Sequence, residues 1–126
     1  MKLRIKGNSV RLRVSPSEVA RLLKGGRIED TIRFGPAEEA KLTYALEQAE
    51  GPEAIWLRYR PQEVAVVVSS AAAQIWGRSE QVGIYGDFET GSGTVGLVVE
   101  KDFACLDRAD EENEDTFPNP LSGTKC

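Results

Sequence analysis

Apolar and polar residues alternate along the first part of the chain. In residues 2–6 and again in residues 10–14, apolar and basic side chains take turns. Alternation with a period of two is typical of a β-strand that buries one face. Because the turn-forming residues Gly7-Asn8-Ser9 separate the two segments, the pattern predicts a β-hairpin over residues 2–14.

A short helix is predicted directly after this hairpin. Ser15 suits the N-cap position, Pro16 suits the first helical position, and Glu18 completes a capping box. The apolar spacing changes here from two to three or four residues, and Gly25-Gly26 marks the end of the helix. Its buried stripe is expected to consist of Val19, Leu22 and Leu23.

Two further strands complete the first half of the chain. Alternation resumes over residues 27–34 and 41–47. The inward side chains expected from it are Ile28, Ile32 and Phe34 in one strand and Leu42, Tyr44 and Leu46 in the other. Residues 48–54, which include Gly51-Pro52, then form a turn.

Residues 57–88 repeat residues 3–34 at an offset of 54 without gaps. Six of the 32 aligned pairs are identical, where chance gives about two. These pairs are 3/57, 4/58, 10/64, 14/68, 15/69 and 34/88. The second copy predicts strands over 55–60, 63–68, 82–88 and 94–100, and a helix that Ser69 caps and that continues to Trp76.

The predicted order of elements in each half is therefore strand, strand, helix, strand, strand. Eight strands with two helices predict an α+β fold, in which one curved antiparallel sheet or closed barrel carries a helix from each half over its core. We expect one domain of two repeats over residues 1–100, the repeats being 1–47 and 55–100. Residues 101–126 are then an extended C-terminal strap and acidic tail, because their acids build no core and their prolines stiffen the chain.

Composition narrows the chemistry that the chain can perform. It has 126 residues, enough for one domain with a core, and it contains no histidine, which excludes Ser-His-Asp and Cys-His catalysis and histidine-bound zinc. Cys105 and Cys126 are too few for a disulfide framework. Because there is no run of about 18 apolar residues and no signal-peptide pattern, we expect a cytoplasmic protein without a membrane span.

Charge is unevenly placed along the chain. Residues 1–100 hold 13 basic and 13 acidic residues, whereas residues 101–126 hold 3 basic and 7 acidic residues and so carry the whole net charge of −4. Within the neutral body, both predicted hairpins place basic side chains opposite their apolar faces. If the related halves bring these faces together, they suit an anionic ligand such as phosphate, a nucleotide or RNA, or a protein partner. The candidate binding residues are Arg4, Lys6, Arg11, Arg13, Arg58 and Arg60, with Lys2 beside them.

The basic face has a plainer interpretation, as a solvated surface or a strand edge protected from aggregation by charge. Nucleic acid is disfavoured as a partner, because the chain is acidic and only Trp56 and Tyr59 stand among the basic residues. The acidic tail is expected either to solubilise the protein or to mask the basic face.

The tail offers little specific chemistry of its own. Its acids do not follow the order of an EF-hand loop, and Cys105 has neither a second thiol nor a histidine nearby for zinc. The apolar neighbours of Cys105 favour an inert, buried thiol. We therefore expect no bound metal and no cofactor. The acids in question are Asp107, Asp110, Glu111, Glu112, Glu114 and Asp115.

Two stretches of the chain, taken together, carry a resemblance. The opening MKLRIKGNSVRLRVSPSEV and the ending VEKDFACL, followed by an acidic run and FPNP, resemble a small family of uncharacterised bacterial proteins, a domain of unknown function. The resemblance covers nearly the whole chain and implies a bacterial cytoplasmic protein whose tail belongs to the domain. It supplies no activity. It also groups Gly7, Asn8, Cys105, Phe117 and Asn119 as a matched set.

We expect a non-enzymatic binding or interaction module that uses the basic face, with the tail modulating access. The runner-up is a metal-dependent binder or an enzyme whose site lies where the strap meets the body. That site would involve Asn8, Cys105, Phe117 and Asn119. Exposed sheet edges also allow a homodimer or a place in a larger assembly.

Overall fold

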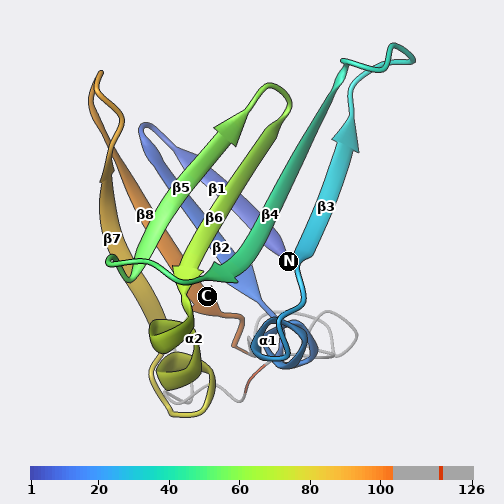
Figure 1. Ribbon diagram of the computed structural model, residues 1–126. Coiled ribbons are helices and arrows are strands. Elements are labelled where there is room, and N and C mark those ends of the chain that lie inside the picture. Colours follow the sequence, from blue (N-terminus) through green and yellow to red (C-terminus); the bar gives the residue numbers. More distant parts are fainter. Residues whose placement is uncertain (104–116, 118–126) are drawn as a thin grey trace.

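A computed structural model describes residues 1–103 and residue 117. They form an α+β fold with eight strands, two helices and two four-stranded sheets (Figure 1). Sheet A has the order β1 (Lys2–Lys6), β2 (Ser9–Val14), β8 (Thr94–Lys101) and β7 (Gly83–Glu89). Sheet B has the order β3 (Ile28–Arg33), β4 (Lys41–Ala49), β6 (Glu63–Ser69) and β5 (Ile55–Arg60). The helices are α1 (Pro16–Leu23) and α2 (Ser70–Gly77).

The expectation of one antiparallel sheet or closed barrel is wrong. The two predicted hairpins form, and the other four predicted strands pair as two further hairpins, but each sheet joins one hairpin from each half of the chain. The central pairs of strands, β2 with β8 and β4 with β6, are parallel. Neither sheet closes on itself, because each ends in two edge strands.

The positions of the helices in the chain explain why each sheet contains a hairpin from each half. Helix α1 connects β2 in sheet A to β3 in sheet B, and α2 connects β6 in sheet B to β7 in sheet A. Each helix has 8 residues. At about 1.5 Å per residue such a helix is roughly 12 Å long, close to the ~10 Å that separates packed sheets. The helices thus carry the chain across the sandwich and cover one end of it (Figure 1).

The predicted helix caps are confirmed. Ser15 Oγ accepts a hydrogen bond from the Glu18 amide at 3.3 Å, and Glu18 Oε1 accepts one from the Ser15 amide at 2.9 Å, which is a complete capping box. Ser69 Oγ accepts from the Ala72 amide at 3.0 Å. Leu22 and Trp76, the matching positions of the two helices, are both fully buried. No helix in the described part of the chain is long and apolar enough to cross a membrane.

The core occupies the helix-proximal half of the sandwich. Ile28 and Leu46 are buried there as expected, but Ile32 and Phe34 are 48% and 69% exposed, so their predicted inward packing is wrong. Ile5 on β1 is likewise 60% exposed. The reason is that the two sheets diverge away from the helices (Figure 1), and that β1 and β3 are edge strands with a neighbour on one side only.

The offset of 54 residues between the two halves does not hold for the strands that follow the helices. Ile28 pairs with Leu46 in sheet B, and Ile84 pairs with Val99 in sheet A. Ile84 follows Ile28 by 56 positions and Val99 follows Leu46 by 53. The connections around β3 and β7 differ in length. Phe34 consequently lies beyond the end of β3, whereas Phe88, its partner in the ungapped alignment, packs against the core from β7.

The two sheets come close together along strands β5 and β7, which are in contact. Gly86 on β7 faces Ile55 on β5, and a Cβ atom at Gly86 would lie 2.5 Å from Cγ2 of Ile55. Ile55 is buried and β-branched, so it has little freedom to move aside. A residue without a side chain is therefore required at this point of the interface.

We predict that Gly86→Ala lowers the free energy of unfolding by about 1–3 kcal/mol through overpacking against Ile55. Gly96→Ala is the matched control, since its added Cβ would meet its nearest neighbour at an ordinary 3.5 Å. The control changes stability by less than about 1 kcal/mol. Urea denaturation of both variants measures the difference. Equal losses in the two variants would contradict the close approach of the sheets at Gly86.

Candidate functional site

Five basic side chains share the outer face of sheet A, the face turned away from sheet B. Because Leu12 and Val14 of β2 point into the core, alternation turns the basic residues between and beside them outward. The antiparallel register of β1 and β2 places Lys2 opposite Arg13 and Arg4 opposite Arg11. We call this set the cationic cluster, and it consists of Lys2, Arg4, Lys6, Arg11 and Arg13.

Only part of this positive charge is compensated. Glu100 of β8 accepts a hydrogen bond from Arg13 Nε at 3.0 Å and lies 3.5 Å from Arg11 Nε. The carboxylate of Asp102 lies 2.9 Å from Lys2 Nζ. Among the described residues, two carboxylates thus pair with three of the five cations. In the part of the chain that the structure describes, no acidic side chain lies within ion-pair distance of Arg4 or Lys6.

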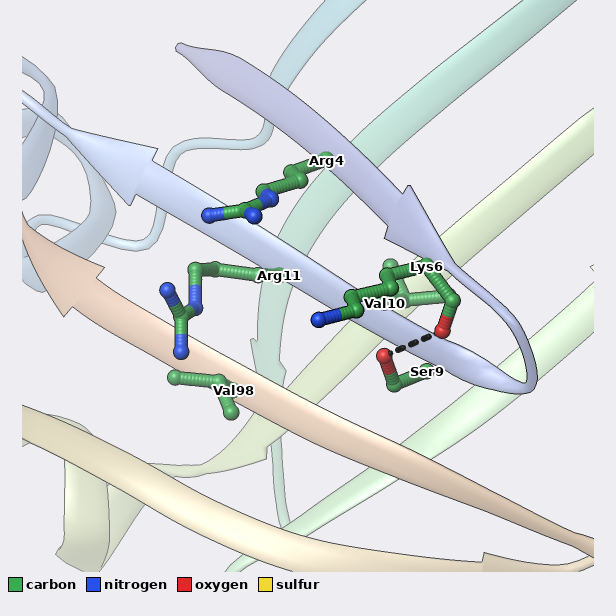
Figure 2. A pocket seen from close by; sticks show the side chains of 6 residues that line it. All are labelled: Arg4, Lys6, Ser9, Val10, Arg11 and Val98. Carbon is green, nitrogen blue, oxygen red and sulfur yellow. Dashed lines mark hydrogen bonds between the residues drawn. The ribbon is translucent and has the colours of Figure 1, made fainter.

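Directly opposed like charges on neighbouring strands are destabilising. Arg4 and Arg11 form such a pair, and both side chains reach over the same face of the sheet (Figure 2). Since the Glu100 carboxylate is shared between Arg11 and Arg13, it does not relieve the charge of Arg4. The cluster therefore keeps an electrostatic cost that a bound anion would remove.

A shallow hollow of about 160 Å³ lies among these side chains. Figure 2 shows the six residues that line it, which are Arg4, Lys6, Ser9, Val10, Arg11 and Val98. Ser9 Oγ donates a hydrogen bond to the carbonyl oxygen of Lys6 at 2.7 Å and so fixes the hairpin end beside the hollow. The hollow has cationic walls and the size of a single charged group.

The structure does not bring Arg58 and Arg60 to this cluster. Both lie on β5 of sheet B, and therefore on the other side of the sandwich. Arg58 donates two hydrogen bonds to the Glu47 carboxylate, one of them at 2.9 Å. Arg27 contacts Glu47 as well, and also Glu29 and Glu63. The basic residues predicted to form one face are thus divided between two sheets with different degrees of neutralisation.

Glu47, which contacts both arginines of this network on sheet B, is held in its charged form. The hydrogen bond from Arg58 lowers the pKa of Glu47, and the charge of Arg27 lowers it further, although burial acts in the opposite direction. The same hydrogen bond raises the pKa of Arg58. Sheet B therefore carries an internally paired charge network beside Arg60, whereas on sheet A Arg4 and Lys6 have no acidic partner among the described residues.

The residues of the predicted strap–body site do not come together. Asn8 lies in the β1–β2 turn, where its carbonyl oxygen accepts a hydrogen bond from the Gly96 amide at 3.0 Å. Phe117 lies at the other end of β2, since its amide donates to Asp102, whose own amide donates to Val14. The six residues of β2 separate the two places by roughly 20 Å. Cys105 and Asn119 lie outside the described residues.

Phe117 nevertheless has defined partners at that end of sheet A. Its ring lies 5.7 Å from the ring of Phe103, and the Lys101 ammonium group lies 5.5 Å from its centroid. Lys101 is 6% exposed, and burial lowers the pKa of its side chain. Its Nζ donates to the carbonyl oxygen of Ser79 at 2.6 Å. These contacts anchor Phe117 at the end of β8.

Metal-binding chemistry finds no support in residues 1–103 and 117. In this part of the chain no three residues of the types His, Cys, Asp and Glu stand together as ligands. The acids of the tail, from Asp107 to Asp115, lie outside the described residues.

Several residues beside the cationic cluster were not predicted from the sequence. Val98 and Tyr85 stand in the same row as Arg11, because β8 pairs in parallel with β2 and antiparallel with β7. Alternation within β7 and β8 shows which residues share a face. It does not show that β8 joins β2, about 80 residues earlier, and this pairing is what places Glu100 and Val98 next to the basic residues.

The chain was compared with known families, curated proteins and solved structures. The model of a family described as a family of unknown function (DUF7009) matches residues 1–121. The match includes the FPNP segment at 117–120, in agreement with the resemblance of the two terminal motifs. Neither the curated proteins nor the solved structures contain a match to this chain.

We predict that Glu47→Gln lowers the free energy of unfolding by about 1 kcal/mol at neutral pH, the size typical of a partly exposed ion-pair network. The pKa of Glu47 is lowered in the folded protein from an ordinary value of 4.5. Its contribution is therefore present above pH 4.5 and is lost as the pH falls through the lower, folded value. Denaturant unfolding at neutral and strongly acidic pH tests this.

Glu38→Gln is the control for this pH dependence. Glu38 also has a basic partner, since its carboxylate lies 3.2 Å from Lys41 Nζ, but its side chain is 81% exposed. Its replacement leaves the neutral-pH stability unchanged within error. A Glu47→Gln variant as stable as the wild type at neutral pH would show that the network on sheet B contributes nothing.

Proposed function

Since the chain belongs to the family of unknown function DUF7009, we propose its function from its own geometry. The protein is a non-enzymatic binding module, and the outer face of sheet A holds an anionic ligand through the cationic cluster. One observation carries this proposal. Arg4 stands opposite Arg11 beside a hollow, and neither Arg4 nor Lys6 has an acidic partner in the described residues.

The chemistry of the cluster suits phosphate or carboxylate oxygens. Arginine presents a planar fork of N–H donors that matches both groups, and lysine adds a mobile point charge. Arg4, Lys6 and Arg11 line one hollow from two strands, so that one anion can accept hydrogen bonds from all three. These three cationic donors attract and orient an anion.

A small ligand fits this face better than an extended polyanion. The cations are concentrated at the β1–β2 side of sheet A, whereas Asp87 and Glu89 lie on β7 at its other side. A nucleic acid strand or a long acidic protein segment crossing the sheet would bring negative charge against these carboxylates. A single anionic group seated at the cationic cluster avoids them.

We also propose that the two halves are copies of one unit. Support comes from the helices α1 and α2, which begin 54 residues apart at residues 16 and 70, and from their buried Leu22 and Trp76. In this proposal the copies diverged in charge. Arg58 is the counterpart of Arg4 at the offset of 54, and it acquired the partner Glu47.

The setting of the protein is part of the same proposal. We place it in the bacterial cytoplasm as one domain with a C-terminal strap, and the contacts of Phe117 with Phe103 and with Lys101 at the end of β8 support this strap. The unpaired outer sides of the edge strands offer a route to a homodimer. An acidic partner protein is the alternative source of the anionic group.

We predict that Arg4→Gln and Lys6→Gln each weaken binding of inorganic pyrophosphate about 10-fold, through loss of one charge-assisted hydrogen bond. Isothermal titration calorimetry at low and moderate salt measures the affinity, which falls as salt rises. The matched control is Arg60→Gln, which removes one exposed positive charge from sheet B. It leaves the affinity unchanged.

The same variants separate binding from folding. Because Arg4 opposes Arg11, Arg4→Gln is expected to maintain or raise the melting temperature while it weakens binding. An equal loss of pyrophosphate affinity in Arg60→Gln, or no binding by the wild-type protein, would overturn the proposed function.

A further inference from the structure

The outer face of sheet A continues beyond the cationic cluster into a second hollow. This wide, open depression of about 340 Å³ is lined by Ser9, Tyr85, Gly86, Asp87, Gly96, Leu97 and Val98. Ser9 and Val98 line the first hollow as well, so the two form one groove across the strands. The second hollow is within the range of small-molecule sites, roughly 300–1,000 Å³.

The strand register fixes the order of chemical groups along this groove. Arg11 is beside Val98, and Val98 is beside Tyr85, so one row runs from a cation through an apolar side chain to an aromatic ring. Neighbouring strands are about 4.8 Å apart, which puts the backbones of Arg11 and Tyr85 roughly 10 Å from each other.

In the next row, a glycine without a side chain forms the floor of the groove. Ser9 is beside Gly96, and Gly96 is beside Asp87. A Cβ atom at Gly96 would lie 3.5 Å from Ser9 Cβ and 3.8 Å from Asp87 Oδ1, so these two side chains flank a gap that is one side chain deep. A flat group can approach the backbone at this point.

Tyr85 of β7 also lines the second hollow. Its side chain lies over Gly83, with the hydroxyl oxygen 2.9 Å from where a Cβ atom of Gly83 would stand. The residue is nevertheless 59% exposed. Exposed aromatic rings that line a hollow are suited to stacking against the π-face of a planar ligand, an interaction that every nucleobase can make.

We propose that this groove binds a nucleoside phosphate, an inference that rests on the proposed anion-binding function. The phosphate is held by Arg4, Lys6 and Arg11. The sugar passes over Val98 and the bare Gly96, and the base stacks against Tyr85. Asp87 accepts a hydrogen bond from an N–H group of the base or from a sugar hydroxyl.

Two features select this ligand class over simpler anions. Inorganic phosphate or a short carboxylate would fill only the cationic end of the groove, and it would contact neither the second hollow nor Tyr85. The carboxylate of Asp87 at the far end repels a second negative charge and favours a hydrogen-bond donor. A nucleoside monophosphate is charged at one end and carries donors on a flat ring at the other, across a length comparable with the groove.

The test compares the four nucleoside monophosphates with ribose 5-phosphate, which carries the same phosphate group without a base. Titrations followed by amide NMR shifts give the affinities for the full-length chain. We expect at least one nucleotide to bind about 10-fold more tightly than ribose 5-phosphate because of stacking. Tyr85→Ala removes this advantage and leaves the ribose 5-phosphate affinity unchanged, while Arg4→Gln weakens both.

Tyr59→Ala is the matched control, since Tyr59 is a 68% exposed tyrosine on sheet B. It retains the preference for the nucleotide. If all nucleotides bind no more tightly than ribose 5-phosphate, or if Tyr85→Ala keeps the preference, the inference fails while the anion site stands. If neither pyrophosphate nor ribose 5-phosphate binds, the proposed function fails as well.

Discussion

The parallel pairing of the central strands, β2 with β8 and β4 with β6, is the constraint on which the rest of the structure depends. It joins a hairpin from the first half of the chain to one from the second half in each sheet. Because the register of a pair fixes every neighbour along it, this pairing decides which outward residues stand in one row. It places Glu100 beside Arg13, and Val98 beside Arg11.

The same arrangement produces two outer faces with different electrostatics. On sheet B, Glu47 accepts hydrogen bonds from Arg27 and Arg58, and the network is paired within itself. On sheet A, Glu100 serves the β2 arginines, and Arg4 on the edge strand has no carboxylate among the described residues. Unpaired charge on an otherwise stable scaffold is available for a ligand, and this contrast is the physical basis of the proposed function.

Local features of the fold could be predicted from the sequence, whereas its long-range features could not. The hairpins and the caps at Ser15 and Ser69 depend on residues a few positions apart, and they form as predicted. Alternation also identified which residues of β1 and β2 face outward. The division of Arg58 from Arg4, by contrast, follows from helices that cross between sheets, and helix length alone does not reveal a crossing. The exposure of Phe34 follows from a change in loop length that an ungapped repeat conceals.

The central claim is that an anion binds the outer face of sheet A, and its most direct test maps where binding occurs. In a ¹⁵N-labelled sample titrated with pyrophosphate, amide and arginine side-chain resonances report each residue separately. The account predicts that the largest shifts fall on Arg4, Lys6 and Arg11, with a smaller one on Val98. Shifts centred on Arg58 and Arg60 of sheet B, or no shifts in either sheet, would contradict it.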